Sequence, residues 1–212
     1  MVLITDVRPY RRTKLFEVCS ETGPEFIANE KFLNENGITP HAQFDDEDFE
    51  GLRARAQLFD AIRKSIDILS RKDYSQKELT RKLCDKGIPE DAAMAAVSYM
   101  VQRGYVDDAR YAKRLAELAR QSYGRQRVEQ ILYHHGIDRE TVRSVLEEVF
   151  CDSNTELTKL EEQIVRAAKD KDLSDPAARN KIFAKMARLG YNPSDISRAL
   201  AHYRPAREDE NA

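Results

Sequence analysis

The chain divides into two regions that differ in the spacing of their hydrophobic residues. Within the first 50 residues, the runs VLITDVRPY and KLFEVCS are rich in β-branched and aromatic residues, which favour β-strands. The segment SETGPE contains a glycine and a proline, and it predicts a turn. We therefore expect a small antiparallel sheet here, too small to be a stable domain alone.

From about Leu52 onward, hydrophobic residues recur with the 3.6-residue period of an amphipathic helix. Six positions of this region also recur 49 residues later, and again after a further 54 residues. They are Leu79, Leu83, Gly87, Ile88, Ala93 and Val97; then Val128, Leu132, Gly136, Ile137, Val142 and Leu146; then Ile182, Met186, Gly190, Tyr191, Ile196 and Leu200. A repeat of this length indicates tandem helical modules, each burying its apolar face against a neighbour.

A longer helix precedes these positions in each copy, with apolar residues that repeat every 49 residues. They are Ile62, Ile66 and Leu69, then Tyr111, Leu115 and Leu118, then Leu160, Ile164 and Ala167. In the second copy, we expect Tyr111, Leu115, Leu118 and Ala119 to face inward. The charged residues of that helix would then lie on the surface.

Helix-ending residues support these boundaries. A glycine closes the middle helix of each copy, because glycine takes the left-handed conformation common just after a helix without a steric penalty. Ser75 with Glu78 fits a capping box, and Asp138 and Asn192 are good N-cap residues. Asp107 or Asp108 is expected to cap the long helix of the second copy and is not interpreted as catalytic.

These patterns predict a mainly α fold, a tandem array of three three-helix repeats that is elongated and curved, with a small β-rich N-terminal extension. The expected extension spans residues 1–50, and the repeats span 51–106, 107–153 and 154–204. Residues 205–212 are expected to form a disordered tail.

The charge of the chain is concentrated in one segment. The whole chain has a net charge of −2, but Ala109 to Arg127 carry six basic residues against one acid, Glu117. The six are Arg110, Lys113, Arg114, Arg120, Arg125 and Arg127. They are either a binding face for an anionic partner or a solvated face partly paired with Glu117. The third copy is read as having no clear basic cluster, which argues against a DNA role for it.

The sequence offers little for catalysis. Its eight glycines lack the spacing of a phosphate-binding loop, and His134 and His135 point to different faces of a helix. Three widely spaced cysteines indicate reduced thiols and no zinc site. We expect no enzyme, cofactor, metal or membrane segment, and the cytoplasm as the location. The repeats fit a binding protein, or a DNA-binding array; the lack of Trp counts against the tryptophan-cored Myb type.

The assembled motifs resemble the RecX family, the regulators of the bacterial RecA recombinase. The similar segments are YSQKELTRKLCDKGI, GYVDDARYA, YGRQRVEQILYHHGI and KIFAKMARLGYNPSDISRAL, which together lie within residues 58–203. The residues assigned to the family motif are Gly87, Gly104, Tyr105, Asp107, Asp108, Tyr111, Gly124 and Gly136.

The resemblance implies a monomeric protein that lies in the groove of the RecA–DNA filament and suppresses ATP hydrolysis, strand exchange and coprotease activity. Its partner would be the RecA filament, with single- or double-stranded DNA as a further possible partner. The candidate contact residues are the six basic residues above, together with Lys77 and Arg81 of the first copy. The alternative is a sequence-nonspecific DNA-binding protein that only occludes the strand.

Overall fold

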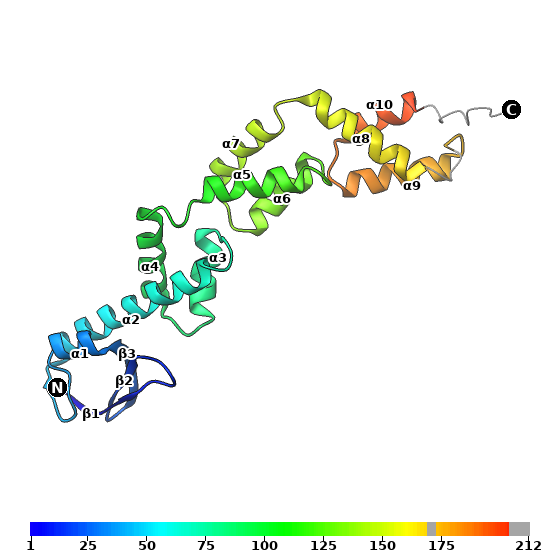
Figure 1. Cartoon of the computed structure of the whole chain (residues 1–212). Helices are drawn as coiled ribbons and strands as arrows, with labels where there is room; N and C mark the ends of the chain where they lie inside the picture. Colours follow the sequence, from blue (N-terminus) through cyan, green and yellow to red (C-terminus); the bar gives the residue numbers. More distant parts are fainter. Residues whose placement is uncertain (169–172, 204–212) are drawn as a thin grey trace. The chain divides into compact units, whose positions relative to one another are not determined.

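The computed structural model describes residues 1–168 and 173–203 of the chain (Figure 1). The chain forms two compact units, Met1–Asp107 and Asp108–Ala212. The predicted mainly helical fold with a small N-terminal sheet is confirmed. The elongated and curved shape stays a prediction of the repeat pattern, and the expected tail at 205–212 lies outside the described residues.

The first unit begins with a four-stranded antiparallel sheet in the order β3-β2-β1-β4. Its strands are β1 (Val2–Pro9), β2 (Leu15–Ser20), β3 (Gly23–Asn29) and β4 (Gln43–Phe44), and the short helix α1 (Glu30–Glu35) follows β3. The turn between β2 and β3 matches the segment predicted from SETGPE.

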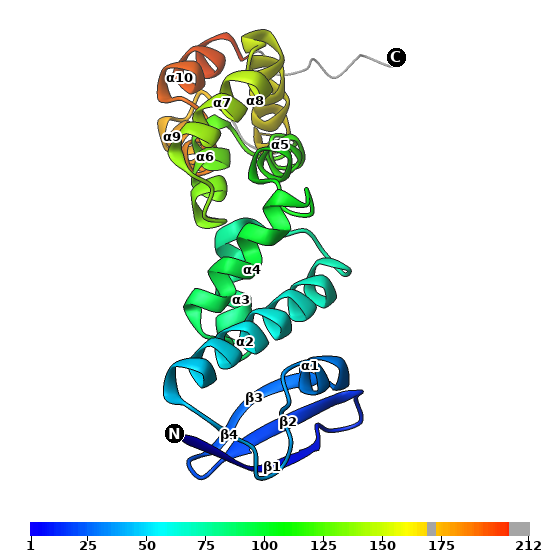
Figure 2. The ribbon, with the colours of Figure 1, turned by 90° about the vertical axis from the view of Figure 1, so that its left-hand side faces the viewer.

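Helix α2 (Asp46–Leu69) runs from the sheet into the first repeat (Figure 2). It stabilises the small sheet because it contributes side chains both to the core under the sheet and to the core of the first repeat. Its N-terminal half packs Phe49, Leu52 and Ala56 against the sheet. Its C-terminal half packs against α3 (Gln76–Cys84) and α4 (Glu90–Gln102), and the three helices form the first repeat. The expected boundary between residues 50 and 51 therefore falls inside a continuous helix.

The second unit contains the other two repeats (Figure 1). Helices α5 (Asp108–Ala119), α6 (Arg125–His134) and α7 (Arg139–Val149) share one core. Helices α8 (Ser153–Ala168), α9 (Pro176–Arg188) and α10 (Pro193–His202) share another. Each core is built from one stretch of sequence, as expected for a repeat.

The register predicted for the second and third helices of each repeat is confirmed. All the apolar residues of the three matched sets are buried, from Leu79 in the first repeat to Leu200 in the third. Gly87, Gly136 and Gly190 have φ values of 79°, 79° and 88° at their helix ends, which L-residues rarely adopt. The predicted capping box at Ser75 and the caps at Asp138 and Asn192 are also present.

The register predicted for the long helices is wrong at two positions. Leu118 is 61% exposed and Ile66 is 56% exposed. The buried face of α5 instead includes Ala112 and Ala116, which are fully buried, and Tyr111, which is 8% exposed. Small side chains allow neighbouring helices to approach closely, so alanines occupy the contact while the bulkier leucine stays outside.

The second and third repeats meet at two glycines. The Gly124 amide donates to Leu189 O (2.8 Å) and the Gln126 amide to Gly190 O (3.2 Å). The unpaired amides at the start of α6 thus bind carbonyls at the end of α9. A Cβ atom on Gly124 would lie 2.5 Å from Gly190 O, so no larger residue fits without a backbone shift.

Candidate protein-binding surface of the second repeat

Helix α5 presents part of the predicted basic segment to solvent. Arg110, Lys113 and Arg114 are exposed because Tyr111, Ala112 and Ala116 occupy the buried face. Lys113 forms an ion pair with Glu148 on α7. Its hydrogen bond to Glu148 and the charge of that carboxylate raise the pKa of Lys113. The solvated-face reading expected Glu117 as the partner of this lysine, whereas the carboxylate that it contacts comes from another helix.

Arg120 and Arg125 have a structural role that the sequence did not reveal. Arg120 Nη1 donates to Val149 O (2.5 Å), and Arg125 Nη1 donates to Leu146 O (2.9 Å). These oxygens belong to the last turn of α7, where the helix dipole favours positive charge. Leu146 O also accepts a hydrogen bond from the Phe150 amide (3.0 Å). The Arg120 guanidinium also lies 5.6 Å from the ring centre of Phe150. Both arginines are half-buried and complete the C-terminal end of α7.

Arg127 is exposed on α6, and its Nη1 donates to Gln130 Oε1 (3.0 Å). Lys77 and Arg81 are exposed four residues apart on α3 and therefore share one face of that helix. They lie in the first compact unit, whereas the other candidate contacts lie in the second. The partner-binding role of all eight residues stays a prediction.

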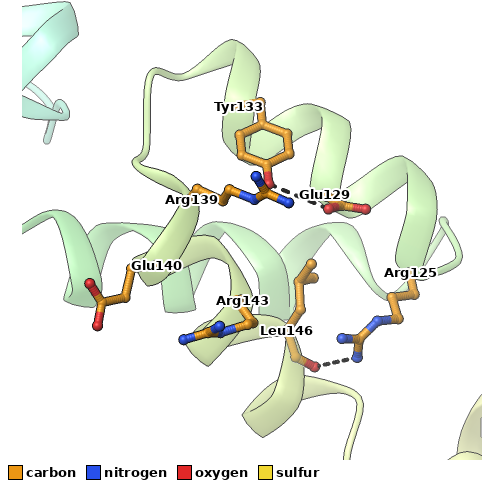
Figure 3. Close-up of a pocket in the computed structure, with 7 residues that line it drawn as sticks. All are labelled: Arg125, Glu129, Tyr133, Arg139, Glu140, Arg143 and Leu146. Atoms are coloured by element: carbon orange, nitrogen blue, oxygen red, sulfur yellow. Dashed lines mark hydrogen bonds between the residues drawn. The ribbon is translucent and has the colours of Figure 1, made fainter.

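A groove of about 590 Å³ between α6 and α7 adds residues that the sequence analysis missed (Figure 3). Its lining combines three arginines with two glutamates, a tyrosine and a leucine: Arg125, Arg139, Arg143, Glu129, Glu140, Tyr133 and Leu146. Arg139 and Arg143 are exposed and lie one helical turn apart. The sequence contained a signal for this pair, because two arginines four residues apart directly after the Asp138 cap lie on one face of the helix.

The groove carries charges of both signs. Glu129 accepts a long hydrogen bond from the Tyr133 hydroxyl (3.5 Å), and Glu140 lies beside Arg139 in the first turn of α7. A row of phosphates would be repelled by these two carboxylates. A protein segment with both acidic and basic side chains can instead pair with each sign, and Tyr133, 43% exposed, offers apolar contact.

The family-motif residues are mostly structural. Gly104 has a φ of 72°, and Gly124 lies at the joint described above. The Tyr111 hydroxyl is 3.1 Å from His135 Nδ1 and so ties α5 to the end of α6. Asp108 begins α5 and Asp107 precedes it, as expected for the start of that helix. Tyr105 is a large aromatic residue that is nevertheless 63% exposed.

Among the described residues, no group of three or more His, Cys, Asp or Glu side chains is placed to hold a metal ion. Within the same residues, no helix combines the length and the apolar character that crossing a membrane requires.

Family models and relatives identify the family of this chain. Family models described as the first and second three-helix domains of RecX match residues 61–100 and 107–146. A protein of Stenotrophomonas maltophilia named "Regulatory protein RecX" is 32% identical over 153 residues, which cover 72% of this chain and 92% of the relative. A protein of the same name from Caldanaerobacter subterraneus subsp. tengcongensis is 25% identical over 200 residues, covering 94% of this chain and 98% of the relative.

Solved structures share the fold. A crystal structure of a regulatory protein RecX matches with a TM-score of 0.67 at 14% identity, covering 95% of this chain and all of the other. RecX from Lactobacillus salivarius matches with a TM-score of 0.61 at 17% identity, covering 68% of this chain and 95% of the other.

Proposed function

This chain belongs to the RecX family of regulatory proteins, and from that premise we propose that it binds the RecA–DNA filament and inhibits it. The inhibited activities would be ATP hydrolysis, strand exchange and coprotease activity. The protein would act in the cytoplasm, as a binding partner and not as an enzyme.

The observation that carries the proposal is the mixed-charge groove of the second repeat. Arg139 and Arg143 are exposed there between Glu129 and Glu140, which suits a protein partner with complementary charges. Arg125 is fixed by its bond to Leu146 O, so this part of the groove is organised before a partner arrives. A preorganised surface loses less conformational entropy on binding.

The test is ATP hydrolysis by a RecA filament on single-stranded DNA, measured against the concentration of this protein. We expect inhibition by the wild type, and an inhibitory concentration raised about tenfold or more by Arg139→Glu with Arg143→Glu, because each lost contact and each new repulsion costs about 1 kcal/mol or more. Arg110→Glu with Arg114→Glu, compared in the same assay, tests whether α5 belongs to the same surface.

The matched control is Arg166→Glu with Arg198→Glu, which makes the same change of charge on exposed residues of the third repeat. Inhibition should survive in this control. A wild-type protein that leaves ATP hydrolysis unchanged would contradict the proposed function. If the groove variant folds and inhibits like the wild type, the groove is not the surface that contacts the filament.

The alternative, a protein that occludes DNA without contacting RecA, differs in its binding to bare DNA. Such a protein would inhibit only where it also saturates the bare strand. A filament contact predicts inhibition at concentrations that leave bare DNA unbound.

A further inference from the structure

A small pocket lies in the third repeat, between α8 and α10, and we call it the α8–α10 pocket. Its volume is about 210 Å³, and it shares no lining residue with the groove between α6 and α7. At about 30 Å³ for each water molecule, it has room for about seven waters or for one long side chain. Its lining combines two leucines with two carboxylates, a hydroxyl and a guanidinium: Leu157, Leu160, Glu156, Asp195, Tyr191 and Arg198.

Tyr191 brings a buried polar group to this pocket. The residue is only 3% exposed, and among the described residues its hydroxyl has no hydrogen-bond partner. Burial and the charges of Glu156 and Glu162 raise the pKa of Tyr191, so the hydroxyl keeps its proton at neutral pH. Buried hydroxyl groups are normally hydrogen-bonded, because an unsatisfied one costs free energy. The hydroxyl therefore indicates a bound group that supplies its partner.

The two carboxylates of the pocket are held in place by the protein but only half used. Glu156 Oε1 accepts from the Arg125 amide (3.2 Å), and Asp195 Oδ1 accepts from Arg198 Nη2 (2.8 Å). Within the part of the chain that the structure describes, the second oxygen of each group accepts no hydrogen bond. Two carboxylates and one guanidinium leave the pocket with a net charge of −1.

The position of these carboxylates has a structural reason as well. Glu156 and Asp195 lie in the first turns of α8 and α10, where the helix dipole favours negative charge. The dipole does not account for the buried hydroxyl of Tyr191 or for the apolar side of the pocket. The combination of acceptors with apolar surface points to a cation that carries a hydrocarbon chain.

We propose that the α8–α10 pocket receives the side chain of an arginine from a protein partner. A guanidinium is planar and carries five N–H donors, so it can bind carboxylate oxygens and a hydroxyl oxygen together. Its aliphatic stem would lie on Leu157 and Leu160, and its charge would neutralise the pocket. A lysine ammonium is a compact, strongly hydrated charge, which suits acceptors on two separate helices less well.

This inference deepens the proposed function and rests on it for the partner, since the arginine would belong to a RecA subunit of the filament. It adds a contact in the third repeat to the groove of the second. The pocket itself can be tested without RecA, so the two proposals can fail separately.

The first experiment titrates the full, isotope-labelled chain with Nα-acetyl-arginine amide in about 50 mM salt and follows the backbone amides of the pocket by NMR. We expect their signals to shift with a dissociation constant of about 1 mM, as for a ligand of so few atoms. Nα-acetyl-citrulline amide has nearly the same shape without the charge and should not saturate the pocket. Nα-acetyl-lysine amide should bind more weakly than the arginine probe.

Three substitutions change the pocket in opposite directions. Glu156→Gln keeps an oxygen for the Arg125 amide but removes a charge, and should weaken binding of the arginine probe about tenfold. Tyr191→Phe removes only the hydroxyl and should weaken it about threefold. Arg198→Gln frees Asp195 and should instead tighten it about threefold.

The matched control is Glu162→Gln, which removes a carboxylate of the same helix that pairs with Arg166 and does not line the pocket. It should leave the affinity for the arginine probe within about twofold of the wild type. The inference is overturned if Glu162→Gln weakens binding as much as Glu156→Gln. It is also overturned if the pocket signals do not respond to the arginine probe, or respond equally to the citrulline or lysine probe.

The filament assay then separates the pocket from the proposed function. If Glu156→Gln loses the probe and needs a higher concentration to inhibit RecA, both are supported. If the wild type binds the probe but never inhibits RecA, the pocket stands and the proposed function is contradicted. If Glu156→Gln loses the probe but inhibits like the wild type, the filament does not supply the arginine and the inference is overturned.

Discussion

At the scale of single residues, burial separates positions that hydrophobicity alone makes equivalent. Leu132 and Leu118 lie in the same repeat, but Leu132 is fully buried in its core and Leu118 is 61% exposed. A leucine contributes to stability only through the apolar area that folding removes from water, so the two side chains should differ widely in their contribution.

We expect Leu132→Ala to lower the free energy of unfolding by about 2–5 kcal/mol, because it removes buried methyl groups and leaves a cavity. Leu118→Ala should change it by less than about 0.5 kcal/mol. Chemical denaturation of the two variants measures both values. Similar losses in the two would show that α5 is rotated relative to the structure described above.

Glu25 makes a pH-dependent contribution to folding stability where the sheet meets α2. Burial raises the pKa of Glu25, but hydrogen bonds from Ser20 and Thr22 and the ion pair with Arg53 outweigh it, so the pKa is lowered overall. A carboxyl group whose pKa is lower in the folded state stabilises the fold above its ordinary pKa of about 4.3. That contribution is lost as the pH falls through the depressed folded-state value.

We therefore expect the stability of the wild type to fall as the pH is lowered below about 4.3, and part of this dependence to disappear in Glu25→Gln. The variant should also be less stable at neutral pH, because Arg53 loses one of its two carboxylate partners and keeps only the exposed Glu50. Urea denaturation at a series of pH values gives the comparison, with the exposed Glu35→Gln as the control. Parallel curves for wild type and Glu25→Gln would refute this role.

At the scale of helices, the packing of the second unit depends on which groups hydrogen-bond to the backbone amides and carbonyls at the helix ends. The end of α7 receives two arginine side chains, and the start of α6 receives carbonyls from the end of α9. These contacts join segments that are distant in the sequence, so each helix end also fixes a neighbour.

Arg120→Ala should reduce the free energy of unfolding by about 1–2 kcal/mol, because it removes a charged hydrogen bond to Val149 O and the contact with the Phe150 ring. Arg127→Ala, which removes an exposed arginine bonded to Gln130, should cost less than about 0.5 kcal/mol. Thermal unfolding of both variants distinguishes the structural arginine from the surface arginine. The expectation fails if Arg127→Ala is the more damaging change.

Gly124→Ala should destabilise the second unit by about 1–3 kcal/mol, since its methyl group would meet the Gly190 backbone at 2.5 Å. Gly51→Ala is the matched control, because Gly51 lies within α2 and nothing would come within 4 Å of the added carbon. There the same change should stabilise the protein by about 0.5–1 kcal/mol through the higher helix propensity of alanine. Equal effects in the two variants would exclude a close joint at Gly124.

At the scale of the whole molecule, the described residues form four separate hydrophobic cores and two compact units. Three of the cores belong to the repeats, and the fourth joins the sheet to the first half of α2. We expect stability in such a chain to be local, so that a substitution in one core lowers the stability of that core and leaves the others nearly unchanged.

Hydrogen exchange followed by mass spectrometry tests this locality. Leu132→Ala should accelerate amide exchange in α5–α7 and leave α2–α4 near the wild-type rate, whereas Leu83→Ala should do the reverse. Acceleration throughout the chain in both variants would instead mean that the two units unfold together.

The sequence by itself determined the repeat, the register of the second and third helices, and the glycines and caps at their ends. These features are local: a left-handed glycine, an N-cap and a buried stripe depend on residues within one or two turns. Much of the candidate contact set also came from the sequence, because exposed arginines follow from the same period.

Only the tertiary structure decided how those residues are used. Ala112 and Ala116 replaced Leu118 at the helix contact because close approach depends on the size of the facing side chains, which the period of one helix does not contain. Arg120 and Arg125 became caps because the end of α7 lies within their reach, and Gly124 became a joint because Gly190 meets its backbone. The availability of a charge likewise depends on its neighbours in space, so the pairing of Lys113 with Glu148 could be recognised only once the chain was folded.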